Sequence, residues 1–140
     1  MPNHHHLLVR QDGQERAGLL QQRLFNSYTK AYNRRCDHSG TLFPGPYRAI
    51  RLESESHLLH LCRYIHANPV QDGLASTPED WPYSNYLDWI GERPGALIDR
   101  AFVREHFPAP ANYRRFVLDY LRERRTPKEV EHYLADWEAE

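Results

Sequence analysis

The stretch from residue 54 to residue 70 reads SESHLLHLCRYIHANPV and has the spacing of an amphipathic helix. At about 100° per residue, its apolar side chains fall within one sector roughly 100° wide. This apolar stripe consists of Leu58, Leu61, Cys62 and Ile65. Tyr64 and Asn68 lie about 40° apart at the polar edge of the stripe. Because the residue before a proline avoids helical angles, we predict a helix from Ser54 to Ala67 that ends at Asn68-Pro69.

The flanking sequence combines further helices with short extended segments. Residues 15–35 repeat apolar side chains at spacings of three and four, which predicts a helix, and residues 98–107 and 112–125 are predicted to be helical too. A last helix is predicted to start at the capping box Thr126-Pro127-Lys128-Glu129. Residues 4–10 and 47–52 have the pattern of strands, and residues 81–89 form an aromatic-rich irregular stretch.

The size and composition of the chain are those of one small domain. Its 140 residues, 40% of them hydrophobic, are enough for one core. We expect a cytoplasmic protein, since the sequence has neither an apolar run of membrane-spanning length nor the pattern of a signal peptide. Residues 1–64 contain nine Lys and Arg against five Asp and Glu, and residues 65–140 contain nine against fourteen. A basic first half fits a surface for a polyanion, and equally fits ordinary solvated charge.

Three histidines open the first predicted strand. Side chains alternate along a strand, so His4 and His6 would share one face and could offer two imidazoles to one divalent metal ion. A purification-tag fragment or a solvated polar terminus would also explain three histidines. However, these run directly into the apolar residues 7–9, not into a linker. Tyr64 likewise has an ordinary explanation, as an interfacial tyrosine with its ring in the core and its hydroxyl in water.

Four motifs occur in the order seen in a known family of enzymes. They are Met1-Pro-Asn-His-His-His-Leu-Leu, Tyr32-Asn33-Arg34-Arg35 with Ser39-Gly40-Thr41-Leu42-Phe43, Tyr64-Ile65-His66-Ala67-Asn68-Pro69-Val70, and Trp81-Pro82-Tyr83-Ser84. Together they resemble the single-tyrosine HUH transposases, and most narrowly the REP-associated tyrosine transposases. The resemblance covers about residues 1–90.

The resemblance implies an α+β fold, with a ferredoxin-like antiparallel sheet and packed helices. Members of the family usually have a strand, a helix and another strand ahead of the Met-Pro-Asn-His motif, so the sheet expected here is incomplete at its N-terminal side. The implied organisation is a transposase-like catalytic domain over residues 1–90, followed by a helical C-terminal extension over residues 91–140. Three features depart from the family pattern: His5 between the two ligands, Pro44 and Pro46 in the second motif, and Asn85 in place of a serine.

The resemblance also implies a role for each site residue. Tyr64 matches the nucleophile, and His4, His6 and Asn68 match the ligands of a divalent metal ion, Mg²⁺ or Mn²⁺. Tyrosine attack would cut single-stranded or hairpin DNA through a 5′-phosphotyrosine intermediate and rejoin it. Contacts to the DNA backbone are expected from Arg10, Arg16, Arg23, Lys30, Arg34, Arg35 and Arg48. For each of these, solvated helix charge is the alternative.

Two classes of function therefore stay open. The first is a DNA nicking and joining enzyme, with a monomer or homodimer acting on DNA and no membrane partner. The second is a catalytically silent remnant that only binds DNA hairpins. A small structural zinc protein is a weaker third possibility, since no cysteine pair accompanies the histidines.

Overall fold

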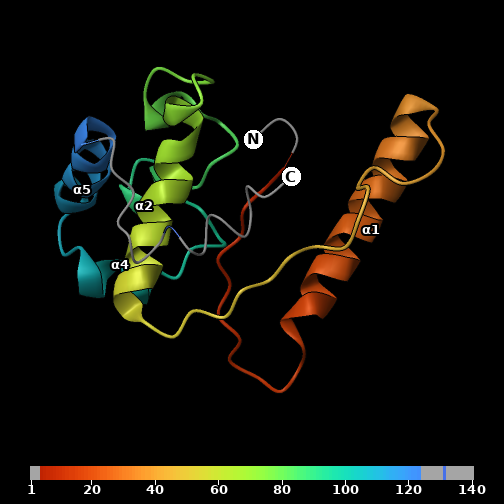
Figure 1. The fold of residues 1–140 in the computed structure, drawn as a ribbon, viewed down its shortest axis with the longest axis horizontal. Helices are drawn as coiled ribbons and strands as arrows, with labels where there is room; N and C mark the ends of the chain where they lie inside the picture. Colours follow the sequence, from red (N-terminus) through yellow and green to blue (C-terminus); the bar gives the residue numbers. More distant parts are fainter. Residues whose placement is uncertain (1–3, 124–130, 132–140) are drawn as a thin grey trace. The chain divides into compact units, whose positions relative to one another are not determined.

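The computed structural model describes residues 4–123 and residue 131, and these residues form two compact units. One unit consists of residues 7–50. The other combines residues 4–6 with the chain from residue 51 onward. We call them the α1 unit and the α2–α5 unit after their principal helices (Figure 1). The predicted last helix lies outside the described residues, apart from Glu131.

The α1 unit is built on one long helix, as the spacing of residues 15–35 predicts. The helix α1 spans Ala17–Cys36 and ends at Asp37, whose left-handed backbone (φ 48°) turns the chain back. Asn33 holds this turn, because its side-chain amide donates to the carbonyl of Gly40 at 3.0 Å. The following segment to residue 50 has no helix or strand. None of the described residues 7–50 is fully buried.

The helix α2 spans Glu55–Gln71 and continues through Pro69, so the predicted end at Ala67 is wrong. Proline removes only one backbone donor, the N–H that would reach the carbonyl of Ile65. The last turn still closes, because the N–H of Asp72 donates to the carbonyl of Asn68 at 2.9 Å. Gly73 then ends the helix with a positive φ of 70°. This extra turn keeps Asn68 on helical backbone, one turn beyond Tyr64.

Short elements complete the α2–α5 unit. They are the 3-10 turn η1 (Pro78–Asp80), α3 (Tyr86–Trp89), α4 (Arg100–His106) and α5 (Pro110–Glu123). The helices α2 and α5 pack side by side (Figure 1). Their core consists of Ala67, Tyr86, Ile90, Tyr113, Val117 and Tyr120, all buried. Residues 91–123, which the sequence predicts to be a helical extension, thus share one compact unit with α2.

The described part of the chain contains no β-strand, which overturns the prediction of an α+β fold with a ferredoxin-like sheet. Residues 4–10 and 47–52 have no regular secondary structure. A strand is stable only when another strand satisfies its backbone hydrogen bonds, and the two segments do not pair with each other. The alternating pattern of apolar and polar residues therefore indicated an extended backbone, but it could not show whether a neighbouring strand is present to pair with it. Among the described helices, none has the length and apolar character needed to cross a membrane.

Candidate active site

One of the three predicted metal ligands, His6, lies beside the predicted nucleophile Tyr64, and a second, His4, lies beside His6. The ring centres of His4 and His6 are 4.9 Å apart, at an angle of 76° between their planes. The His6 ring in turn lies 6.1 Å from the ring of Tyr64, again edge to face. Tyr64 is half-buried on α2, where its ring packs against Leu61 and the main core. The three side chains belong to the same compact unit.

Asn68 is the third predicted ligand, and α2 presents it one turn after Tyr64. Its side chain is only 5% exposed. Its side-chain oxygen Oδ1 is buried and has no hydrogen-bond partner among the described residues. A buried acceptor without a partner costs free energy, about 1–3 kcal/mol, so such a group is a good candidate for binding a cation or a water molecule.

The protonation of the histidines suits metal binding. Burial, and to a smaller extent nearby His4, lower the pKa of His6 from 6.5 to about 4. Burial and His4 also lower the pKa of His5, whose side chain is exposed. His5 is therefore not enclosed in a core, although its place between two ligands suggested that it would be. Neutral imidazole is the form that ligates metals, so His6 is ready to bind at neutral pH.

These residues fit a divalent ion. With metal–nitrogen bonds of about 2.1 Å, two imidazoles on one ion have ring centres roughly 4.6–5.3 Å apart, a range that includes the spacing of His4 and His6. No cluster of three or more His, Cys, Asp and Glu suited to a metal occurs in the described chain, residues 4–6 included. A third protein ligand would thus be of another type, and the buried amide oxygen of Asn68 is the predicted candidate. Oxygen ligands suit both Mg²⁺ and Mn²⁺, and the two imidazoles favour Mn²⁺ of the two.

His66, in the middle of the third motif, has a structural role that the sequence did not reveal. It is fully enclosed, with Nδ1 bonded to the hydroxyl of Tyr113 at 2.5 Å and Nε2 bonded to Oδ1 of Asn85 at 2.9 Å. Burial lowers the pKa of His66 from 6.5 to about 4. Asn85, the departure from the serine of the family pattern, is therefore the residue that fixes His66. The alternation of polar and apolar residues gave no signal for this pair.

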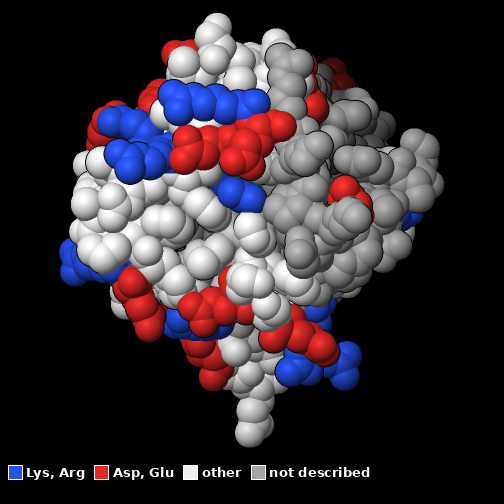
Figure 2. Space-filling model, turned by 60° about the vertical axis from the view of Figure 1, so that its left-hand side comes forward, with Lys and Arg blue, Asp and Glu red and all other residues white. Residues whose placement is uncertain are grey.

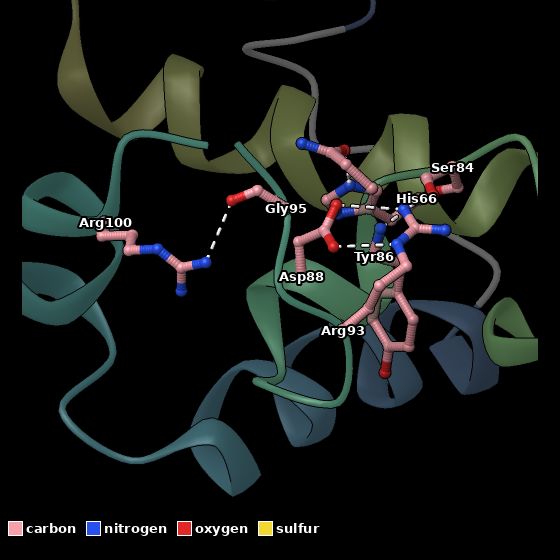
Figure 3. A network of polar contacts seen from close by, with 8 residues as sticks. His66, Ser84, Tyr86, Asp88, Arg93, Gly95 and Arg100 are labelled. Atoms are coloured by element: carbon pink, nitrogen blue, oxygen red, sulfur yellow. Dashed lines mark hydrogen bonds and ion pairs between the residues drawn. The ribbon is translucent and has the colours of Figure 1, made fainter. Parts of the chain in front are cut away.

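A second buried polar group fixes the loop after α3 (Figure 3). The carboxylate of Asp88 accepts two bonds from the guanidinium of Arg93, at 2.8 and 3.0 Å. Arg93 also donates to the carbonyl of Ser84 at 2.5 Å, which ties both ends of α3 together. The bond to Arg93 is the main cause that lowers the pKa of Asp88. Gly95 is required here, since a Cβ on it would lie 2.4 Å from the Asp88 carboxylate.

The residues predicted to bind DNA all lie in the α1 unit and are all exposed. Arg23, Lys30, Arg34 and Arg35 are on α1, and Arg16 is its N-cap residue. Arg48 lies on the segment after the helix. Arg10 makes an ion pair with Asp12 at 2.7 Å, so its charge is partly compensated. Most of the residues predicted to contact DNA are therefore on or next to a single helix, α1.

The α5 side of the other unit has a different charge pattern. Figure 2 shows basic and acidic side chains next to one another on this side. Arg114 of α5, for example, pairs with Glu79 at 3.2 Å and with Glu92 at 2.5 Å. A polyanion would meet carboxylates as well as cations here.

Comparison of the chain with protein-family models, with curated proteins and with solved structures finds no match.

Proposed function

We propose that the protein nicks and joins single-stranded or hairpin DNA, with Tyr64 as the nucleophile. One observation carries the proposal: the ring of His6 lies next to Tyr64, and the ring of His4 next to His6, in one compact unit, although 57 residues lie between His6 and Tyr64 along the chain. A solvated histidine-rich terminus has no reason to meet the residue that the motifs single out. Asn68, buried and with an unsatisfied oxygen, adds a fourth member one turn along α2.

The chemistry assigned to Tyr64 is a reversible transfer. The tyrosine oxygen forms a bond to the phosphorus of the DNA backbone while the bond from phosphorus to the 3′-oxygen breaks. The tyrosine proton passes to solvent, and the leaving 3′-oxygen takes up a proton to become a hydroxyl. The product is a 5′-phosphotyrosine, which a second 3′-hydroxyl can attack to restore the phosphodiester and the tyrosine. The phosphotyrosine ester retains the energy of the phosphodiester bond that was broken, so joining needs no nucleotide cofactor.

His4, His6 and Asn68 are the residues that would hold a divalent ion in this reaction. Bound there, Mg²⁺ or Mn²⁺ would place positive charge at the phosphate oxygens and help to orient the phosphorus for in-line attack. The ring of Tyr64 packs on Leu61, which restricts the movement of the side chain. The partner is DNA, the protein acts in the cytoplasm as a monomer or homodimer, and no membrane is involved.

The adduct on Tyr64 is the direct test of the proposal. A labelled single-stranded hairpin incubated with the protein and Mn²⁺ is expected to form a covalent adduct that survives a denaturing gel. Tyr64→Phe keeps the ring packing and removes the nucleophile, so the adduct is expected to disappear while the fold persists. Tyr83→Phe, at an exposed tyrosine outside the site, is the matched control and is expected to retain the adduct.

A hairpin-binding module without catalysis is the second candidate, favoured by the exposed cations of the α1 unit. Hairpin binding without an adduct from the wild-type protein would overturn the catalytic proposal and leave this module. An adduct in the Tyr64→Phe protein would contradict the assignment of the nucleophile and point to another tyrosine, such as Tyr28 or Tyr47.

Metal binding gives a test that is independent of catalysis. Calorimetric titration with Mn²⁺ is expected to show a site in the wild-type protein that the double change His4→Ala, His6→Ala abolishes. His38→Ala removes an exposed imidazole of the α1 unit and is expected to leave the affinity unchanged. Equal affinity in the wild-type and double-variant proteins would show that His4 and His6 are not ligands.

A further inference from the structure

Aromatic side chains form an array along α1 and the segment that follows it. The Tyr28 and Tyr32 rings, one helical turn apart, have centres 6.5 Å apart and planes within 28° of each other. Tyr32 contacts His38 at 5.9 Å, and Tyr28 contacts Phe43 at 6.4 Å. Phe43 in turn packs edge to face on Phe25, at 4.9 Å. We call these five residues the aromatic array.

The two tyrosines at the centre of the array are open to solvent. Tyr28 is 54% exposed and Tyr32 is 40% exposed. Leu20 and Leu24, at the same spacing of four residues, continue the stripe toward the start of the helix and are also about half exposed. A contiguous apolar surface of this kind on a described helix without buried residues marks a binding surface.

The charge of α1 selects the partner. The helix contains Arg23, Lys30, Arg34 and Arg35 and not one Asp or Glu. At about 100° per residue, Arg35 falls about 20° from Tyr28 and about 60° from Tyr32, whereas Arg23 and Lys30 fall roughly 140–180° from the two tyrosines. Flat aromatic rings beside a cation suit a ligand that has both flat apolar faces and negative charge. Single-stranded nucleic acid has both, since bases stack on aromatic rings and phosphates attract Lys and Arg.

We propose that the aromatic array is a stacking platform for unpaired bases of single-stranded DNA, with Tyr28 and Tyr32 each taking one base. The choice of DNA rests on the proposed function, and the location and mode of binding rest on the array. Arg35, the cation of α1 beside the two tyrosines, contacts a phosphate next to the stacked bases. The platform gives the protein a way to hold the unpaired strand that flanks a hairpin.

The ring spacing predicts which strands bind best. Stacked bases lie about 3.4 Å apart, roughly half of the distance between the two tyrosine rings. One strand can therefore place successive bases on Tyr28 and Tyr32 only if its own bases are unstacked. The bases of oligo-thymidine stack weakly on one another, so separating them costs little free energy. Oligo-adenosine and duplex DNA would have to break their own stacking first.

Binding of fluorescent oligonucleotides by the full-length Tyr64→Phe protein, in EDTA, separates this proposal from catalysis. Changing Tyr28→Leu together with Tyr32→Leu keeps apolar bulk but removes stacking, and is expected to weaken oligo-thymidine binding about ten-fold or more. The salt dependence is expected to stay the same, because the phosphate contacts are retained. Tyr28→Phe with Tyr32→Phe, and the exposed control Tyr83→Leu, are expected to bind within about two-fold of the parent.

Three results would overturn the platform. They are wild-type affinity in the double leucine variant, oligo-adenosine or duplex bound as tightly as oligo-thymidine, and binding of phosphatidylserine vesicles in place of DNA. Circular dichroism is expected to show an unchanged helix content in every variant, since the substituted side chains are exposed. Tight oligo-thymidine binding that depends on Tyr28 and Tyr32, together with no adduct from the wild-type protein incubated with hairpin DNA and Mn²⁺, would reject the catalytic proposal and support the platform.

Discussion

His66 links the third motif to the stability of the protein through its protonation. Its pKa is about 4 in the folded chain and 6.5 when unfolded, because burial disfavours the charged ring. As pH falls from about 6.5 to 4, the unfolded state binds a proton that the folded state resists, and the free energy of unfolding falls. His66→Gln is expected to remove about 1–3 kcal/mol of this pH dependence. Urea unfolding at pH 7 and pH 4.5 measures the difference. His6 titrates in the same range in both proteins, so an unchanged pH dependence in the variant would contradict the assignment to His66.

Gly95 is a second residue whose type depends on a buried polar group, here the carboxylate of Asp88. Gly95→Ala would force a methyl group against the Asp88 carboxylate and disturb its bonds to Arg93. We expect a loss of about 1–3 kcal/mol in the free energy of unfolding. The matched control is Gly13→Ala, where a Cβ would meet nothing within 4 Å. Equal melting temperatures for the two variants would show that the loop after α3 yields without cost.

At the scale of elements, helices could be predicted from the sequence and strands could not. The spacing of apolar residues places α1, α2, α4 and α5 within a few residues of their observed ends, because a helix satisfies its own backbone. Residues 4–10 needed a partner strand, which a local pattern cannot supply. The course of α2 past Pro69 also escaped prediction. Residues 66–69 are all buried, so every side of this turn is enclosed by protein. The turn therefore lacks the alternation of apolar and polar faces from which a helix is predicted.

The first turn of α2 and the end of α4 are joined by a contact between Glu55 and His106. This hydrogen bond is the main cause that raises the pKa of His106. A raised histidine pKa stabilises the fold below its ordinary value of 6.5, and the gain is lost as pH rises through the folded-state pKa. Glu55→Gln is therefore expected to lower the free energy of unfolding at pH 5.5, by at most about 1 kcal/mol because Glu55 is exposed, and to have little effect at pH 8.5. Glu53→Gln, at an exposed neighbour outside the pair, should show no such contrast. A loss from Glu55→Gln that is the same at both pH values would assign it to something other than His106.

At the scale of the whole molecule, the predicted site residues form two local pairs, whereas the sheet that was predicted to carry them is absent from the described residues. His4 and His6 are two residues apart, and Tyr64 and Asn68 are one turn apart on a helix, so local geometry alone brings each pair together. The sequence did not predict that the candidate site residues and the expected DNA-binding residues would lie in different units. The histidines and Tyr64 are in the α2–α5 unit, and the expected DNA-binding residues are in the α1 unit.

Burial predicts that these two units differ in stability. Every fully buried described residue lies between Leu61 and Tyr120, and the described residues 7–50 include none. Few buried contacts mean a small free energy of local opening, so amides of α1 are expected to exchange hydrogen faster than those of α2 and α5. Exchange measured by mass spectrometry tests this, first for the protein alone and then with saturating oligo-thymidine. Bound DNA stabilises what it binds, so the strand is expected to slow exchange in α1 and to have no such effect in the variant with Tyr28→Leu and Tyr32→Leu. Protection of α1 equal to that of α5 without DNA would contradict the link between burial and stability, and slowing confined to α5 would place the strand on the other unit.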